Sequence, residues 1–188
     1  MSFKVLVIPE DPTQNGYLLK PLAEAILADA GKPNAKVVVL TNPRLQGYDQ
    51  AVHAMREELP GRYGFWDLWI FVPDADRATR ETALALEQEM AAKGIALVCC
   101  PAQPEVEIYA CVAYRQEIEG GWQQARRNPR LKEEIFDALL KKHGDPRRAG
   151  GGRDIMVGEA LASLQALYHF CPELKQLRDR IAEVATRQ

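Results

Sequence analysis

The sequence predicts an α/β fold, a Rossmann-like and mostly parallel four-stranded sheet followed by a helical C-terminal half. Four short apolar runs rich in β-branched residues alternate with helical segments, and the β signal ends near residue 104. Strands that alternate with helices of about 12 to 15 residues imply right-handed βαβ crossovers. We therefore expect residues 1–103 to form an α/β core, with residues 104–188 as a helical part packed on it within a single domain.

The expected strands are near-continuous in apolar residues, which is typical of strands buried on both faces. They are residues 3–8 (FKVLVI), 36–41 (KVVVLT), 67–72 (DLWIFV) and 95–100 (IALVCC). Apolar residues at helical spacing predict the intervening helices, and glycines predict where the first and third of them end. The helices expected along the whole chain are 16–30, 48–59, 79–93, 105–116, 132–143, 157–169 and 173–185.

The bulk composition excludes some classes of protein. The chain has 188 residues, 47% of them hydrophobic, and a net charge of −2, which gives no sign of a nucleic-acid coat over the whole surface. No apolar run approaches the roughly 20 residues that span a bilayer, so we expect no membrane segment. With no signal peptide and no Cys-x-x-Cys pair, we expect a cytoplasmic protein whose four cysteines are reduced and mostly buried.

Acidic residues follow three of the four expected strands. They are Glu10 and Asp11 after the first strand, Asp74 and Asp76 after the third, and Glu105 and Glu107 after the fourth. In an open parallel sheet the carboxyl ends of the strands share one edge, where ligands bind. Crowded carboxylates repel one another unless a cation neutralises them, and hard oxygen ligands suit Mg²⁺ or Mn²⁺. The alternative for Asp76 is a helix cap ahead of Thr79.

A first strand ending in Glu, followed by a later hydrophobic strand ending in Asp-x-Asp, resembles the Toprim domain. Toprim domains occur in topoisomerases, primases, recombination proteins and the nucleases of the OLD family. The resemblance implies that Glu10, Asp74 and Asp76 bind Mg²⁺ (or Mn²⁺) and serve phosphoryl-transfer chemistry.

A narrower resemblance links the chain to small stand-alone Toprim-like proteins, including the RloB-like proteins of phage defence. Residues 9–17 (PEDPTQNGY) are similar to their opening motif of Glu-Gly, Thr-Glu and an aromatic residue. Residues 104–109 (PEVEIY) look like their Pro-x-Phe-Glu-x-Trp motif, with Glu107 as its acid, and residues 171–174 (CPEL) resemble their C-terminal end. The resemblance implies a catalytic set of Glu10, Asp74, Asp76 and Glu107.

Two residues depart from that pattern. Asp11 stands where the family has Gly, and Gln14 stands where it has the Glu of the Thr-Glu pair. A glycine lets the backbone approach a metal or phosphate closely, whereas Asp11 adds a side chain and a charge. The two departures imply either altered metal binding or a domain that keeps the fold without catalysis.

Residues 126–153 hold a local excess of positive charge, with nine Lys or Arg against four acids. Its functional interpretation is a flank that contacts the nucleic-acid backbone, with Arg147, Arg148 and Arg153 beside flexible glycines. The alternative is a solvated helix face followed by a loop, as most charge runs are.

Two functions remain open from the sequence. The first is a Mg²⁺-dependent, Toprim-like nuclease or other phosphodiester-processing enzyme, acting on DNA or RNA in bacterial defence against foreign DNA. The second is an inactive Toprim-like subunit that serves as an interaction module beside an ATPase partner. A flavodoxin-like or receiver-like domain is a third and weaker alternative, since the fourth strand ends in Cys99 and Cys100 where a receiver places a Lys. The oligomeric state stays undetermined.

Overall fold

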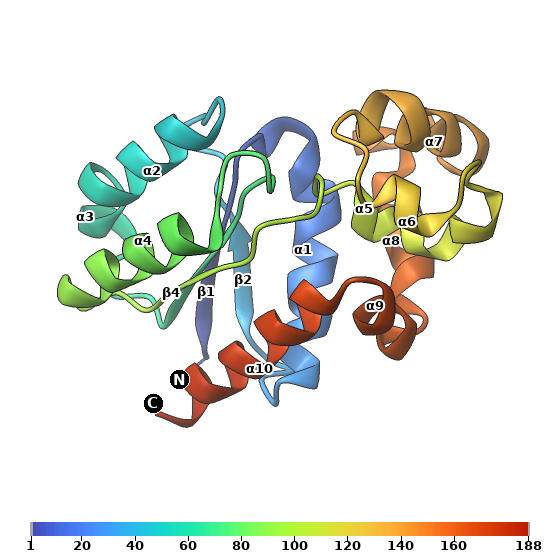
Figure 1. The fold of residues 1–188 in the computed structure, drawn as a ribbon. Helices are drawn as coiled ribbons and strands as arrows, with labels where there is room; N and C mark the ends of the chain where they lie inside the picture. Colours follow the sequence, from blue (N-terminus) through green and yellow to red (C-terminus); the bar gives the residue numbers. More distant parts are fainter. Residues whose placement is uncertain (1, 188) are drawn as a thin grey trace.

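The computed structural model describes residues 2–187 and confirms the predicted fold class (Figure 1). Its four-stranded sheet is parallel throughout and has the order β2-β1-β3-β4. The strands are β1 (Lys4–Pro9), β2 (Lys36–Val39), β3 (Leu68–Val72) and β4 (Leu97–Cys99). Each lies within its predicted segment or extends one residue beyond it.

The strand order reverses between β1 and β3. From β1 the chain moves to β2 on one side, and it then returns to place β3 and β4 on the other side. The last residues of the two central strands, Pro9 and Val72, are register partners. Side chains that follow these strands therefore meet at the point where open α/β sheets bind ligands.

Helices cover both faces of the sheet (Figure 1). The helix α1 (Pro12–Asp29) lies on one face, and α2 (Tyr48–Glu57), α3 (Pro60–Tyr63) and α4 (Arg80–Ala92) lie on the other. Alternate side chains of β1 divide between two apolar clusters, as the two-residue period of a strand requires. Val5 and Val7 belong to the cluster on the α1 side, and Leu6 and Ile8 belong to the cluster on the α2 and α4 side.

The helical half contains more and shorter elements than the sequence predicts. They are α5 (Ile108–Cys111), η1 (Val112–Glu117), α6 (Trp122–Ala125), η2 (Lys132–Phe136), α7 (Asp137–His143), η3 (Ala149–Gly152), α8 (Arg153–Leu161), α9 (Leu164–Phe170) and α10 (Pro172–Thr186). Of these, η1 and η3 are 3₁₀ turns and η2 is a π-helical turn.

Three predicted helices differ from those of the structure, one in where it begins and two in being divided into separate elements. The first helix begins at Pro12 rather than at Gly16, because proline fits the first turn of a helix, where its missing N–H is not needed. The expected helix 105–116 is a short α turn followed by a 3₁₀ turn. The expected helix 157–169 is two helices, since Ser163 starts a new one by accepting the Ala166 N–H at 3.2 Å.

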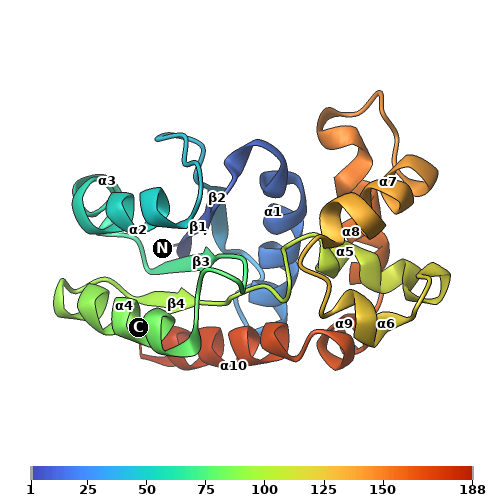
Figure 2. The same cartoon turned by 45° about the horizontal axis from the view of Figure 1, so that its top comes forward.

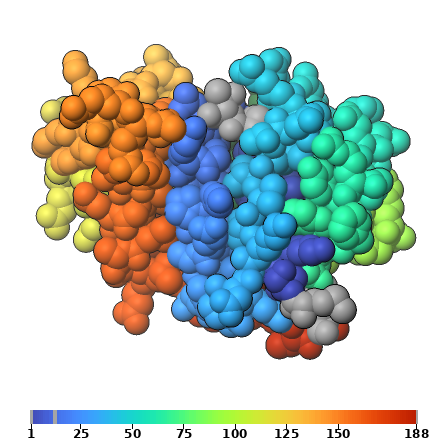
Figure 3. All heavy atoms as spheres, turned by 180° about the vertical axis from the view of Figure 1, so that it is seen from behind, coloured from blue at the N-terminus to red at the C-terminus, as the bar shows by residue number. Residues whose placement is uncertain are grey.

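The helical half shares one apolar core with the sheet. Residues of α5, α8 and α10 belong to the same buried cluster as those of β1 and α1. Figure 2 shows α10 running beside β4, and Figure 3 shows α8 packed along α1 on the opposite side of the molecule. The two carboxylate oxygens of Glu173 accept hydrogen bonds from the Arg126 guanidinium at 2.6 and 2.9 Å, which ties α10 to the chain that follows α6.

The four cysteines are buried free thiols: Cys100, Cys111 and Cys171 lie in this core, and Cys99 lies in the cluster on the α2 and α4 side. Burial raises the pKa of the Cys100 thiol to about 12, which keeps it protonated and unreactive. Within residues 2–187, no helix has both the length and the apolar character needed to cross a bilayer.

Candidate functional site

Glu10 and Asp74 lie in contact at the switch point of the sheet. Glu10 directly follows β1, and one of its carboxylate oxygens, Oε1, accepts a hydrogen bond from the Asp74 N–H at 3.3 Å. Asp74 follows β3, and its Oδ1 accepts from the Val106 N–H at 3.3 Å. Three chain segments thus converge on these two carboxylates, as the positions of the acids after their strands predict.

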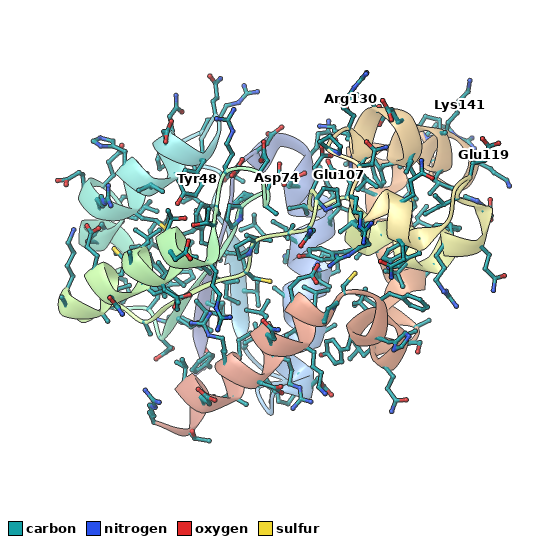
Figure 4. All side chains as sticks on the ribbon, viewed as in Figure 1. Tyr48, Asp74, Glu107, Glu119, Arg130 and Lys141 are labelled. Atoms are coloured by element: carbon teal, nitrogen blue, oxygen red, sulfur yellow. The ribbon has the colours of Figure 1, made fainter. Side chains whose placement is uncertain are left out.

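A pocket of about 180 Å³ opens above these residues, between the sheet and the helical half. Asp74 and Glu107 lie close together at this edge of the sheet (Figure 4). The lining residues are predominantly acidic: Glu10, Asp11, Asn15, Gly47, Asp74, Glu105, Glu107 and Lys132. The pocket therefore contains the predicted Glu10, Asp74 and Glu107, together with Glu105.

The backbone of Gly47 forms part of the pocket wall. Its N–H donates to the carbonyl oxygen of Glu10 at 3.1 Å, which holds the loop before α2 against the end of β1. Gly47 has a φ of 93°, in the left-handed region that glycine adopts without strain. The Gly47–Glu10 hydrogen bond and the left-handed conformation of Gly47 therefore hold this loop at the end of β1.

Four carboxylates of the pocket resist ionisation. Burial raises the pKa of Asp74 to about 8, and the negative charges of Glu10, Glu107 and Glu105 act in the same direction. Burial and the neighbouring Glu107 raise the pKa of Glu105 to about 7. The pKa values of Glu10 and Glu107 are also raised, chiefly by burial. The site therefore binds protons more tightly than the unfolded chain does, and a cation would relieve the same repulsion.

Lys132 is the basic residue that lines the acidic pocket. Its backbone N–H donates to Glu105 Oε2 at 3.1 Å, and its ammonium lies 3.8 Å from Glu107 Oε1. Lys132 is the first residue of the π-helical turn η2, a distortion that often marks functional sites. Sequence reasoning counted this lysine only as one member of a basic run, because no motif singles it out.

The donor set suits Mg²⁺ or Mn²⁺, since it consists of carboxylate oxygens without a thiolate or imidazole. Among residues 2–187, no group of three or more His, Cys, Asp or Glu side chains is gathered closely enough to hold a metal ion. Repulsion among carboxylates favours such a separation when no cation is bound. The residues therefore fit the ion by chemistry, and coordination requires their side chains to turn toward a common point.

Asp76 lies outside the acidic pocket. Its side chain is 68% exposed, and its Oδ2 lies 3.6 Å from Nε of Arg77. Its negative charge nevertheless raises the pKa of Glu10, so it stands near the rim of the pocket. It does not cap α4, because Thr79 does so by accepting the Thr82 N–H at 3.2 Å. The sequence alternative of an Asp76 cap is thus wrong.

The three predicted nucleic-acid-binding arginines have different environments. Arg147 is exposed and paired with Asp145, and Arg148 is paired with Asp154. Arg153 is buried, with its guanidinium donating to the carbonyl oxygen of Gly150 at 2.9 Å. Arg153 therefore serves the packing of the helical half instead of presenting its guanidinium at the surface.

The glycines of this loop form a packed turn, which corrects the expectation of a flexible tether. Gly150 has a φ of 73°, and a Cβ atom there would lie 2.5 Å from the Tyr17 ring. A Cβ atom on Gly152 would lie 2.2 Å from the Asp145 backbone nitrogen. Close packing and backbone conformation therefore require glycine at both positions.

Comparison with known proteins identifies no relative of this chain. No protein-family model, no curated protein and no solved structure matches it. The interpretation of the acidic pocket accordingly rests on its geometry and on the residues that form it.

Proposed function

We propose that the chain is a Mg²⁺- or Mn²⁺-dependent enzyme of the Toprim-like class that cleaves phosphodiester bonds in nucleic acid. The observation that carries the proposal is the contact between Glu10 after β1 and Asp74 after β3 at the switch point. Glu107 and Glu105 add two further carboxylates to the same pocket. The proposed setting is the cytoplasm, in defence against foreign DNA beside an ATPase partner, as the resemblance to RloB-like proteins suggests.

In this proposal Glu10 and Asp74 hold the metal ion, and Asp76 contributes from the rim. A bound Mg²⁺ would polarise the scissile phosphate and lower the pKa of an attacking water. Glu107 is oriented by the Lys132 ammonium, and its raised pKa suits a group that accepts a proton from that water. Glu105 is fixed by the Lys132 N–H and adds negative charge next to Asp74.

The competing function is an inactive interaction module of the same fold. Asp11, which stands where the resembled family has Gly, lines the pocket and adds a further carboxylate. Gln14, the other departure, has its side-chain oxygen buried without a hydrogen-bond partner among the residues that the structure describes. These two residues are the observations that favour a site no longer used for catalysis.

A cleavage screen separates the two functions. Labelled single-stranded and double-stranded DNA and RNA are incubated with the protein in Mg²⁺, in Mn²⁺ and in EDTA. We expect at least one substrate to be cleaved with a divalent metal and none in EDTA, because the carboxylates act through the ion. A Glu10→Gln variant, which keeps the size of the side chain and removes its charge, should lose this cleavage. A wild-type protein that cleaves none of the substrates would favour the interaction module.

A further inference from the structure

A second pocket of about 250 Å³ adjoins the acidic pocket. The two pockets share Asp74 and Glu105, which form a wall between them. On the far side of this wall the second pocket is lined by two arginines, Arg126 and Arg127, and by the exposed Asp76. A ligand that crosses the wall would therefore pass from a strongly acidic environment to one that also presents two guanidinium groups.

The two arginines of the second pocket differ in whether other residues of the protein already bind their guanidinium groups. The guanidinium of Arg126 donates to both carboxylate oxygens of Glu173 and to the carbonyl oxygen of Gln103 at 2.7 Å. Its side chain is only 14% exposed, so it serves the fold. Arg127 is exposed, and its guanidinium makes no ion pair or hydrogen bond with the rest of residues 2–187. It is the arginine available to a ligand.

We propose that Arg127 binds a phosphate of the nucleic-acid strand next to the phosphodiester held at the acidic pocket. This inference rests on the proposed function and names a further substrate-binding residue for it. A polyanionic strand that approaches a cluster of carboxylates needs a cation on its path, and a guanidinium binds phosphate through two parallel hydrogen bonds. Lys132 cannot supply that contact freely, because its ammonium already lies against Glu107.

The test measures binding of a fluorescent single-stranded oligonucleotide in Ca²⁺, which replaces Mg²⁺ to slow turnover. We expect Arg127→Ala to raise Kd about tenfold and to reduce the salt dependence of log K by about 0.7 to 1, the value for one lost phosphate contact. Arg127→Lys should recover part of the affinity. Thermal unfolding of Arg127→Ala should match that of the wild type, because the Arg127 side chain has no ion-pair or hydrogen-bond partner in the described part of the chain.

Arg187→Ala is the matched control. Arg187 is also an exposed arginine outside any ion pair in the described chain, and it lies near the C-terminus, away from the acidic edge of the sheet (Figure 1). An equal loss of affinity in Arg187→Ala, or unchanged affinity in Arg127→Ala, would overturn the inference. Failure of the wild type to bind any oligonucleotide would also overturn it. In that case, metal-dependent hydrolysis of bis(p-nitrophenyl) phosphate by the wild type would show that the proposed phosphodiesterase function holds although the inference about Arg127 fails.

Discussion

Replacing Asp74 with Asn is expected to reduce metal-dependent cleavage by at least about 10²- to 10³-fold, because it removes a central negative charge from the metal site. The asparagine keeps the oxygen that accepts the Val106 N–H, so the local backbone should be retained. The same change should raise the stability of the metal-free protein at pH 8, since Asp74 lies among three carboxylates that repel it. Cleavage rates and thermal unfolding in EDTA measure the two effects.

Asp137→Asn is the control for this substitution. Asp137 is exposed on α7 and lines neither pocket, so the same chemical change there should alter neither cleavage nor stability appreciably. If Asp74→Asn kept wild-type cleavage, Asp74 would not be a metal ligand. If Asp74→Asn unfolded the protein, the Asp74 carboxylate would instead be required for the fold.

The second large effect is a loss of stability of the metal-free protein as pH rises. In the folded protein the pKa of Asp74 is raised to about 8 and that of Glu105 to about 7. The folded state therefore binds these protons more tightly than the unfolded chain does, and the resulting stability is complete below about pH 4. This stabilisation is lost as pH rises through the folded-state pKa values of Glu105 and Asp74. Between pH 5 and 8.5 we expect the free energy of unfolding in EDTA to fall by on the order of 2–4 kcal/mol.

Denaturant unfolding at several pH values in EDTA checks this prediction. Asp74→Asn should flatten the profile, because it removes the pocket carboxyl whose pKa is raised to about 8. Excess Mg²⁺ should oppose the loss at high pH, since a cation binds the deprotonated carboxylates of the folded state. A metal-free wild-type profile that stays flat or rises over this range would contradict the crowding of the four carboxylates.

The sheet could be predicted from the sequence because its strands are buried on both faces. Runs such as residues 67–72 are almost wholly apolar, and this pattern predicts a buried strand whatever the details of side-chain packing. The contact of Glu10 with Asp74 could be expected for a similar reason. Both residues follow strands, and parallel strands bring their carboxyl ends to one edge. Neither expectation depends on contacts between distant side chains.

The helical half could be predicted only in outline. The break at Ser163 depends on a side-chain cap, and the π-helical turn at Lys132 depends on tertiary contacts that outweigh helical propensity. Counting charges could not separate Arg127, which has no partner among the described residues, from Arg126, which is tied to a glutamate 47 residues away in the sequence. That distinction is visible only in the folded chain.

The most direct test of the metal site is a calorimetric titration of Mn²⁺ into the wild-type protein and Asp74→Asn near pH 7, in two buffers of different ionisation enthalpy. Binding to the wild type should release protons, because the raised pKa values leave the pocket partly protonated at that pH. The proton release should appear as a difference in heat between the buffers, and Asp74→Asn should bind at least about tenfold more weakly. Mn²⁺ binding that is absent from the wild type, or equal in the variant, would contradict a metal site built around Glu10 and Asp74.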